Sequence, residues 1–72
     1  MGFYDFMIEN YINDETPLGD LARDMQRDEQ MPEDKNTDVK IKKYLNNRIK
    51  DYEVKKIFRK AFELYLEYKK RE

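Results

Sequence analysis

The 72-residue sequence contains no cysteine, no histidine and no serine. Without cysteine it has neither a disulfide framework nor a thiolate zinc site, and without histidine it lacks the commonest metal ligand and general base. Apart from tyrosine, the hydroxyl side chains are Thr16 and Thr37, so no Ser–His or Cys–His nucleophile can be assembled. We therefore expect a protein that is not an enzyme, with no catalytic residue, no cofactor and no small-molecule substrate.

Long apolar runs are missing as well. No segment approaches the roughly 18 residues of a membrane-spanning helix, and no hydrophobic region of an export signal follows the first residue. Together with the lack of cysteine, these absences predict a cytoplasmic protein with no membrane partner. The length allows a single domain, residues 1–72, which buries only about 60% of the surface that its unfolded chain exposes.

Charge is abundant but unevenly distributed. Charged residues make up 43% of the chain, yet the net charge is −1 and aromatic residues are plentiful, which favours a folded domain over disorder. Residues 1–34 hold ten acidic and two basic residues (net −8), whereas residues 35–72 hold thirteen basic and six acidic residues (net +7). Either the halves fold together and neutralise each other, or they present faces of opposite charge to partners.

The apolar residues follow helical spacing in four segments, and no segment shows the alternation of a strand. The predicted helices cover approximately residues 3–12, 17–28, 37–48 and 51–70. Because the connections are short, we expect an all-α, compact four-helix bundle. Thr16 followed by Pro17 is typical of a helix start, Asp51 is expected to cap the fourth helix, and Asn36 or Thr37 the third.

The apolar stripes of these helices define the expected core. Glycine inside a helix costs about 1 kcal/mol relative to alanine, so Gly19 predicts a close approach of the second helix to the aromatic first helix. Tyr44 and Leu45 are expected on the core face of the third helix, while Val39 is a marginal member of it. The main predicted core residues are Phe3, Phe6, Leu21, Val54, Ile57, Phe58, Ala61 and Tyr65.

Five segments carry a resemblance to a known family. They are FYDFMIENY, TPLGDLARDMQRD, the dipeptide MP at 31–32, DVKIKKYL and IFRKAFELYLEY, and together they span nearly the whole chain. In this order they resemble the YozE-type SAM-like family of small bacterial four-helix domains, with Pro–Leu–Gly–Asp–Leu–Ala as the most specific part. Phe62 stands where many members carry tryptophan, and Phe6 where the start usually carries a bulkier aromatic. Both changes keep an aromatic side chain, so they bear on packing more than on the family assignment. The resemblance implies a SAM-like fold and an interaction module, since SAM-like folds include protein-binding and nucleic-acid-binding members.

Asp20, Asp24 and Asp28 lie four residues apart on the second predicted helix. Successive members drift by about 40° around the helix, from the open face toward the edge of the apolar stripe. Such a row offers a hard cation too few convergent oxygens, so no metal site is predicted. Pairs with Arg23 and Arg27 at i, i+3 are expected to stabilise the row, and the basic half could supply further partners. We interpret the row as an acidic surface for a partner.

A basic cluster lies on the third and fourth predicted helices, and its members on the fourth helix lie opposite the apolar stripe. Its members are Lys42, Lys43, Lys55, Lys56, Arg59 and Lys60. This surface could bind a protein or the phosphates of a nucleic acid. The pI of about 5.5 and the lack of a stacking platform disfavour nucleic acid. We therefore expect a non-catalytic interaction or regulatory module that binds an unknown protein through charged helical faces, with nucleic-acid binding through the basic cluster as the alternative.

Overall fold

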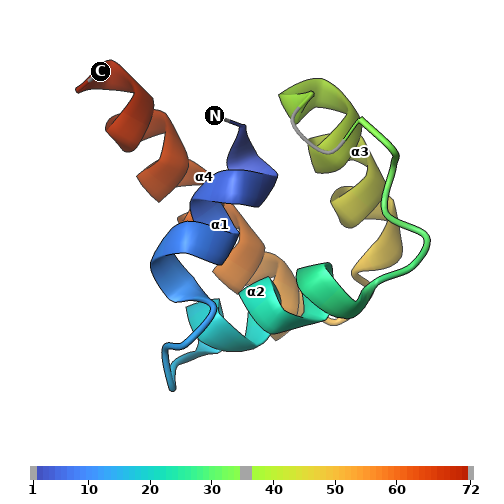
Figure 1. The fold of residues 1–72 in the computed structure, drawn as a ribbon. Helices are drawn as coiled ribbons and strands as arrows, with labels where there is room; N and C mark the ends of the chain where they lie inside the picture. Colours follow the sequence, from blue (N-terminus) through green and yellow to red (C-terminus); the bar gives the residue numbers. More distant parts are fainter. Residues whose placement is uncertain (1, 35–36, 72) are drawn as a thin grey trace.

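The computed structural model describes residues 2–34 and 37–71, which form four helices (Figure 1). The helices are α1 (Phe3–Tyr11), α2 (Pro17–Arg27), α3 (Asp38–Arg48) and α4 (Tyr52–Lys70). No strand occurs in these two ranges, so the predicted all-α class is confirmed. Each helix matches the range expected from the sequence to within one residue at either end.

The starts of α2 and α4 carry the caps that the sequence predicts. The Thr16 hydroxyl accepts a hydrogen bond from the Gly19 amide at 3.3 Å, and Pro17 is the first residue of α2. At the start of α4, the Asp51 carboxylate accepts hydrogen bonds from the amides of residues 53 and 54. Thr37 occupies the capping position of α3 without a side-chain capping bond, and Asn36 lies outside the described residues. These caps satisfy backbone donors that a helix cannot satisfy itself.

Gly19 brings the start of α2 against the end of α1. A Cβ atom at this position would overlap the carbonyl oxygen of Asp14 and lie 3.0 Å from the carbonyl oxygen of Tyr11. The neighbours are backbone atoms, which cannot rotate away as a side chain can. The predicted close approach is therefore confirmed, and it fixes how α2 leaves the α1–α2 turn.

An aromatic cluster between α1 and α4 forms the centre of the core. The Phe3 ring lies 4.7 Å from the ring of Phe62, 5.6 Å from Tyr65 and 5.9 Å from Phe58. Tilted and edge-on contacts of this kind are favourable for aromatic pairs. Six of the core residues predicted from the sequence are buried: Phe3, Phe6, Leu21, Phe58, Ala61 and Tyr65.

Two valines lie outside this core. Val39 on α3 is exposed, and Val54 in the first turn of α4 keeps 40% of its surface exposed although its helical position predicted burial. Val54 lines two hollows that separate the first turn of α4 from α2 and α3. The expectation that Val54 is a core residue was therefore wrong, because the neighbouring helices do not close over it.

The helices are arranged so that α2 crosses below α1, while α3 stands to one side of α4 (Figure 1). Asp38 at the start of α3 bonds to Tyr65 near the end of α4, and Lys42 lies over the ring of Phe62, 5.1 Å from its centre. These contacts show that α3 runs antiparallel to α4. None of the described helices has the length and apolar character needed to cross a membrane.

Candidate interaction surfaces

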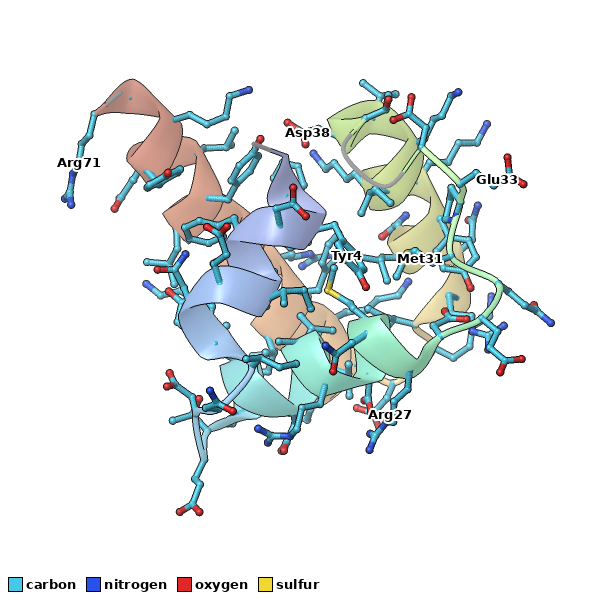
Figure 2. The ribbon with its side chains drawn as sticks, in the orientation of Figure 1. Tyr4, Arg27, Met31, Glu33, Asp38 and Arg71 are labelled. Atoms are coloured by element: carbon cyan, nitrogen blue, oxygen red, sulfur yellow. The ribbon has the colours of Figure 1, made fainter. Side chains whose placement is uncertain are left out.

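The acidic row on α2 divides into two exposed members and one enclosed member. The Asp20 carboxylate pairs with Arg23 and the Asp24 carboxylate with Arg27, each at 2.6 Å, so both predicted i, i+3 pairs are confirmed. The side chains of Asp20 and Asp24 remain 74% and 68% exposed. Figure 2 shows Arg27 pointing outward from the end of α2. This part of the row therefore faces solvent.

Asp28 turns toward α3 and is only 12% exposed. Its carboxylate accepts a hydrogen bond from the Tyr44 hydroxyl at 2.6 Å and from the Gln30 amide at 2.9 Å, and lies 3.9 Å from the Arg48 guanidinium. The hydrogen bond from Tyr44 is the main reason why the pKa of Asp28 is lowered, and the same bond raises the pKa of Tyr44. Asp28 therefore joins α2 to α3 and is not part of the exposed acidic surface.

The contact between Asp28 and Arg48 also bears on the charge asymmetry of the chain. It is the one ion pair, within residues 2–34 and 37–71, that joins the acidic half to the basic half. At Asp20 and Asp24 the cation partners come from α2 itself. Direct neutralisation between the halves is therefore confined to one place, and no three acidic side chains of the described ranges are gathered as a metal ion would require.

Two adjoining hollows lie along α2. One, of about 300 Å³, is bounded by α2 and the start of α4, and the other, of about 350 Å³, also reaches the end of α3. Both include Leu21, Asp24 and Val54, so we treat them as one feature, the α2–α4 groove. Its apolar floor consists of Leu21, Met25, Leu45, Ile49, Val54 and Ile57. Its acidic rim consists of Asp20, Asp24 and Glu53.

The predicted basic cluster lies on α3 and α4. Lys42 and Lys43 on α3 and Lys56, Arg59 and Lys60 on α4 are exposed, while Lys55 is half-buried. The Lys42 ammonium stacks over Phe62, and the Lys56 ammonium lies 3.8 Å from the Glu53 carboxylate and 5.5 Å from the centre of the Tyr52 ring. The cluster is thus solvent-facing, as the sequence predicts, but two of its cations already have neighbours in the fold.

Asp38 has a role that the sequence did not reveal. One carboxylate oxygen accepts a hydrogen bond from the Phe3 amide at 3.0 Å, and the other from the Tyr65 hydroxyl at 2.8 Å with the Lys69 ammonium 3.5 Å away. Figure 2 shows the Asp38 side chain pointing from the start of α3 toward the start of α1. An acid in the first turn of a helix is common because of the helix dipole, so its type and position gave no sign of these distant partners.

Arg23 likewise does more than pair with Asp20. Its guanidinium donates hydrogen bonds to the carbonyl oxygens of Ile12 at 3.0 Å and Asp14 at 2.8 Å. Carbonyl groups at the end of a helix have no partner within the helix, and Arg23 supplies one at the end of α1. The i, i+3 spacing predicted the ion pair but carried no information about these carbonyl groups.

Comparison with known proteins places this helical arrangement in a family. A family model described as the YozE SAM-like fold matches residues 2–67, which include α1, α2, α3 and most of α4. No significant match was found among curated proteins or among solved structures. The resemblance expected from the five segments is thereby confirmed, and the chain belongs to the YozE SAM-like family.

Proposed function

We propose that this domain is a non-catalytic interaction or regulatory module of the cytoplasm, which binds another protein through its charged helical faces. The observation that carries the proposal is the pair of exposed carboxylates on α2. Asp20 and Asp24 face solvent, and their cation partners among the described residues lie on the same helix, while the exposed lysines of α3 and α4 carry the opposite sign. Surfaces of this kind favour association with a partner of complementary charge.

The existing ion pairs leave these surfaces available to a partner. Exposed pairs such as Asp24–Arg27 contribute little to folding because both ions are well hydrated. Replacing one of their cations with a cation of a partner therefore costs little. Complementary charges at an interface mainly speed association and select the partner.

Affinity capture from a lysate of the native cells tests this proposal. We expect the immobilised domain to retain a protein that is lost on Asp20→Lys/Asp24→Lys reversal or on Lys56→Glu/Arg59→Glu/Lys60→Glu reversal. The matched control is Glu63→Lys/Glu67→Lys, which makes the same charge change as the first variant on an exposed stretch of α4. A captured protein that neither reversal affects, or the absence of any saturable protein partner, would contradict the proposal.

Nucleic-acid binding through the basic cluster is the second candidate. It is favoured by Tyr52, which is 67% exposed and lies beside the Lys56 ammonium, since aromatic rings next to cations can stack on bases. A labelled duplex and a labelled single strand should then bind with a steep salt dependence, lost in Lys55→Glu/Lys56→Glu/Arg59→Glu/Lys60→Glu. No binding at low salt would remove this candidate.

A further inference from the structure

The α2–α4 groove has an apolar floor of which Val54 and Ile57 remain accessible to solvent. Val54 retains 40% of its surface exposed, and Ile57 one turn later is half-buried. Leu21 and Met25 of α2 also line the groove, although both are buried in the core. Apolar side chains of both helices therefore line one continuous depression along α2.

The two ends of the groove differ in charge. Around the hollow that includes Pro17, the charged lining residues are Asp20, Asp24 and Glu53, and no lysine or arginine of the described ranges lines it. The other hollow is lined by Arg27 and Arg48 as well as by two aspartates. A segment lying in the groove would therefore meet negative charge at the Pro17 end and mixed charge at the other.

We propose that the α2–α4 groove binds a basic amphipathic helix of a partner protein. Its apolar side chains would pack against Leu21, Val54 and Ile57, and its lysines or arginines would lie against the acidic rim. The proposal rests on the proposed function and specifies the partner surface for it. The eleven residues of α2 extend over roughly 16 Å, enough for about three turns of a helix with apolar residues at i, i+3 or i+4, and i+7.

The carboxylates of the rim can accept these new cations. Glu53 pairs with Lys56 at 3.8 Å, and Asp20 and Asp24 pair with arginines of α2, all on the exposed surface. A lysine or arginine held over the apolar floor would be partly shielded from water and would interact more strongly with these carboxylates than an exposed side chain does. Binding would thus combine apolar burial with a charge preference.

A peptide titration followed by NMR on the isotope-labelled full chain tests this proposal. The probe is a 16-residue helical peptide with leucine at i, i+4, i+7 and i+11 and lysine beside them, and the comparison peptide replaces each lysine with glutamate. We expect amide shift changes at α2 and the first half of α4, and binding of the glutamate peptide weaker by about tenfold or more. No shift changes at millimolar lysine peptide, changes centred on the basic cluster, or equal affinity for both peptides would overturn the proposal.

Variants identify the groove as the binding site. Val54→Lys and Asp20→Lys/Asp24→Lys should each lower the affinity of the domain for the lysine peptide by about tenfold. Leu66→Lys, which alters an exposed leucine about three turns further along α4, should leave the affinity unchanged, as should Glu63→Lys/Glu67→Lys. Circular-dichroism melts confirm that each variant is folded. Equal weakening in the control variants would contradict the assignment to the groove.

Two further outcomes separate this proposal from the proposed function. If a captured cellular protein is lost on Asp20→Lys/Asp24→Lys but kept by Val54→Lys, the charged face binds the partner and the groove proposal fails. If no captured protein depends on either charged face, the proposed function fails whatever the peptide does. Groove shifts that change with protein concentration in the absence of peptide would assign the groove to a second copy and overturn the assignment to a partner helix.

Discussion

Gly19 is the residue at which a single added carbon should affect the fold most directly. Gly19→Ala places a Cβ into the carbonyl oxygen of Asp14, and the backbone of the α1–α2 turn must move to relieve the overlap. We expect a loss of about 2 kcal/mol, since the better helix propensity of alanine offsets only part of the strain. The melting temperature should fall by roughly 10 °C.

Thermal and chemical unfolding followed by circular dichroism measure this loss. Gln26→Ala is the matched control, because it places an alanine at an exposed position of the same helix. Its effect should stay within about 0.5 kcal/mol. A Gly19→Ala variant as stable as the native chain would contradict the close-approach interpretation.

The Tyr44–Asp28 hydrogen bond gives a stability difference that depends on pH. Asp28 keeps its pKa below the value near 3.9 of an unfolded chain, mainly because Tyr44 donates to the carboxylate. The carboxylate therefore contributes stability above that pH and loses the contribution as the pH falls through its lowered pKa. We expect Tyr44→Phe to cost about 1 kcal/mol at pH 7 and less at pH 3. Urea unfolding of the native chain and of Tyr44→Phe at pH 7 and at pH 3 measures the difference in unfolding free energy at each pH.

Titration of the tyrosines by ultraviolet absorbance provides an independent check. The hydrogen bond to Asp28, and after it burial, raise the pKa of Tyr44, so this contribution to stability is present below about pH 10 and is lost as the pH rises through the raised value. Tyr44 should therefore ionise late, in a step that Tyr44→Phe removes, and Asp28→Asn should reduce the delay. Equal costs of Tyr44→Phe at both acidic and neutral pH would contradict the assigned role of Asp28.

At the scale of the helices, Asp38 joins three elements through one carboxylate. Asp38 lies in the first turn of α3, and its carboxylate accepts hydrogen bonds from the first amide of α1 and from the Tyr65 hydroxyl of α4. Asp38→Ala removes these bonds together, and the Tyr65 hydroxyl, on a side chain that is almost fully buried, loses this acceptor. We expect a loss of about 2–3 kcal/mol in urea unfolding.

Two comparisons separate the tertiary role of Asp38 from its effect on α3 alone. Asp51→Ala removes a cap that serves only its own helix, and it should cost about 1 kcal/mol. A double-mutant cycle of Asp38→Ala with Tyr65→Phe should show a coupling free energy of about 1 kcal/mol. Additive losses in the cycle would mean that the Asp38–Tyr65 bond contributes nothing to stability.

Local features of the sequence predicted the helices and their starts, because each depends on neighbours in the chain. Thr16, Pro17 and Asp51 act within one turn, and the i, i+3 partners of Asp20 and Asp24 lie on the same helix. Helical spacing can place these residues without knowledge of the tertiary structure. The same holds for most of the apolar stripe, although it does not hold for Val54.

Features that depend on how helices meet could not be predicted in this way. Helical spacing places Val54 on the core face of α4, but its burial depends on whether α2 reaches the first turn of that helix. Asp28 belonged to the acidic row by spacing, whereas its enclosure follows from Tyr44, sixteen residues away. The α2–α4 groove arises from the same cause, since the packing of α2, α3 and α4 leaves Val54 and Ile57 accessible along it.

At the scale of the whole molecule, a single ion pair among the described residues, Asp28–Arg48, links the two oppositely charged halves. If the fold depended on attraction between net charges of −8 and +7, salt would weaken it strongly. The Asp28–Arg48 contact is long, at 3.9 Å, and the other ion pairs of the described ranges lie within one half, mostly along exposed helix surfaces that contribute little. The packing of the aromatic core should therefore dominate stability.

We accordingly expect sodium chloride to change stability only slightly. Between about 50 mM and 1 M salt, the melting temperature should move by no more than about 5 °C, because weak exposed pairs are screened while apolar burial is retained. The Lys56→Glu/Arg59→Glu/Lys60→Glu variant should likewise fold with nearly native stability. A fall of 15 °C or more in high salt, or unfolding of this variant, would mean that the basic half stabilises the acidic half instead of remaining available to a partner.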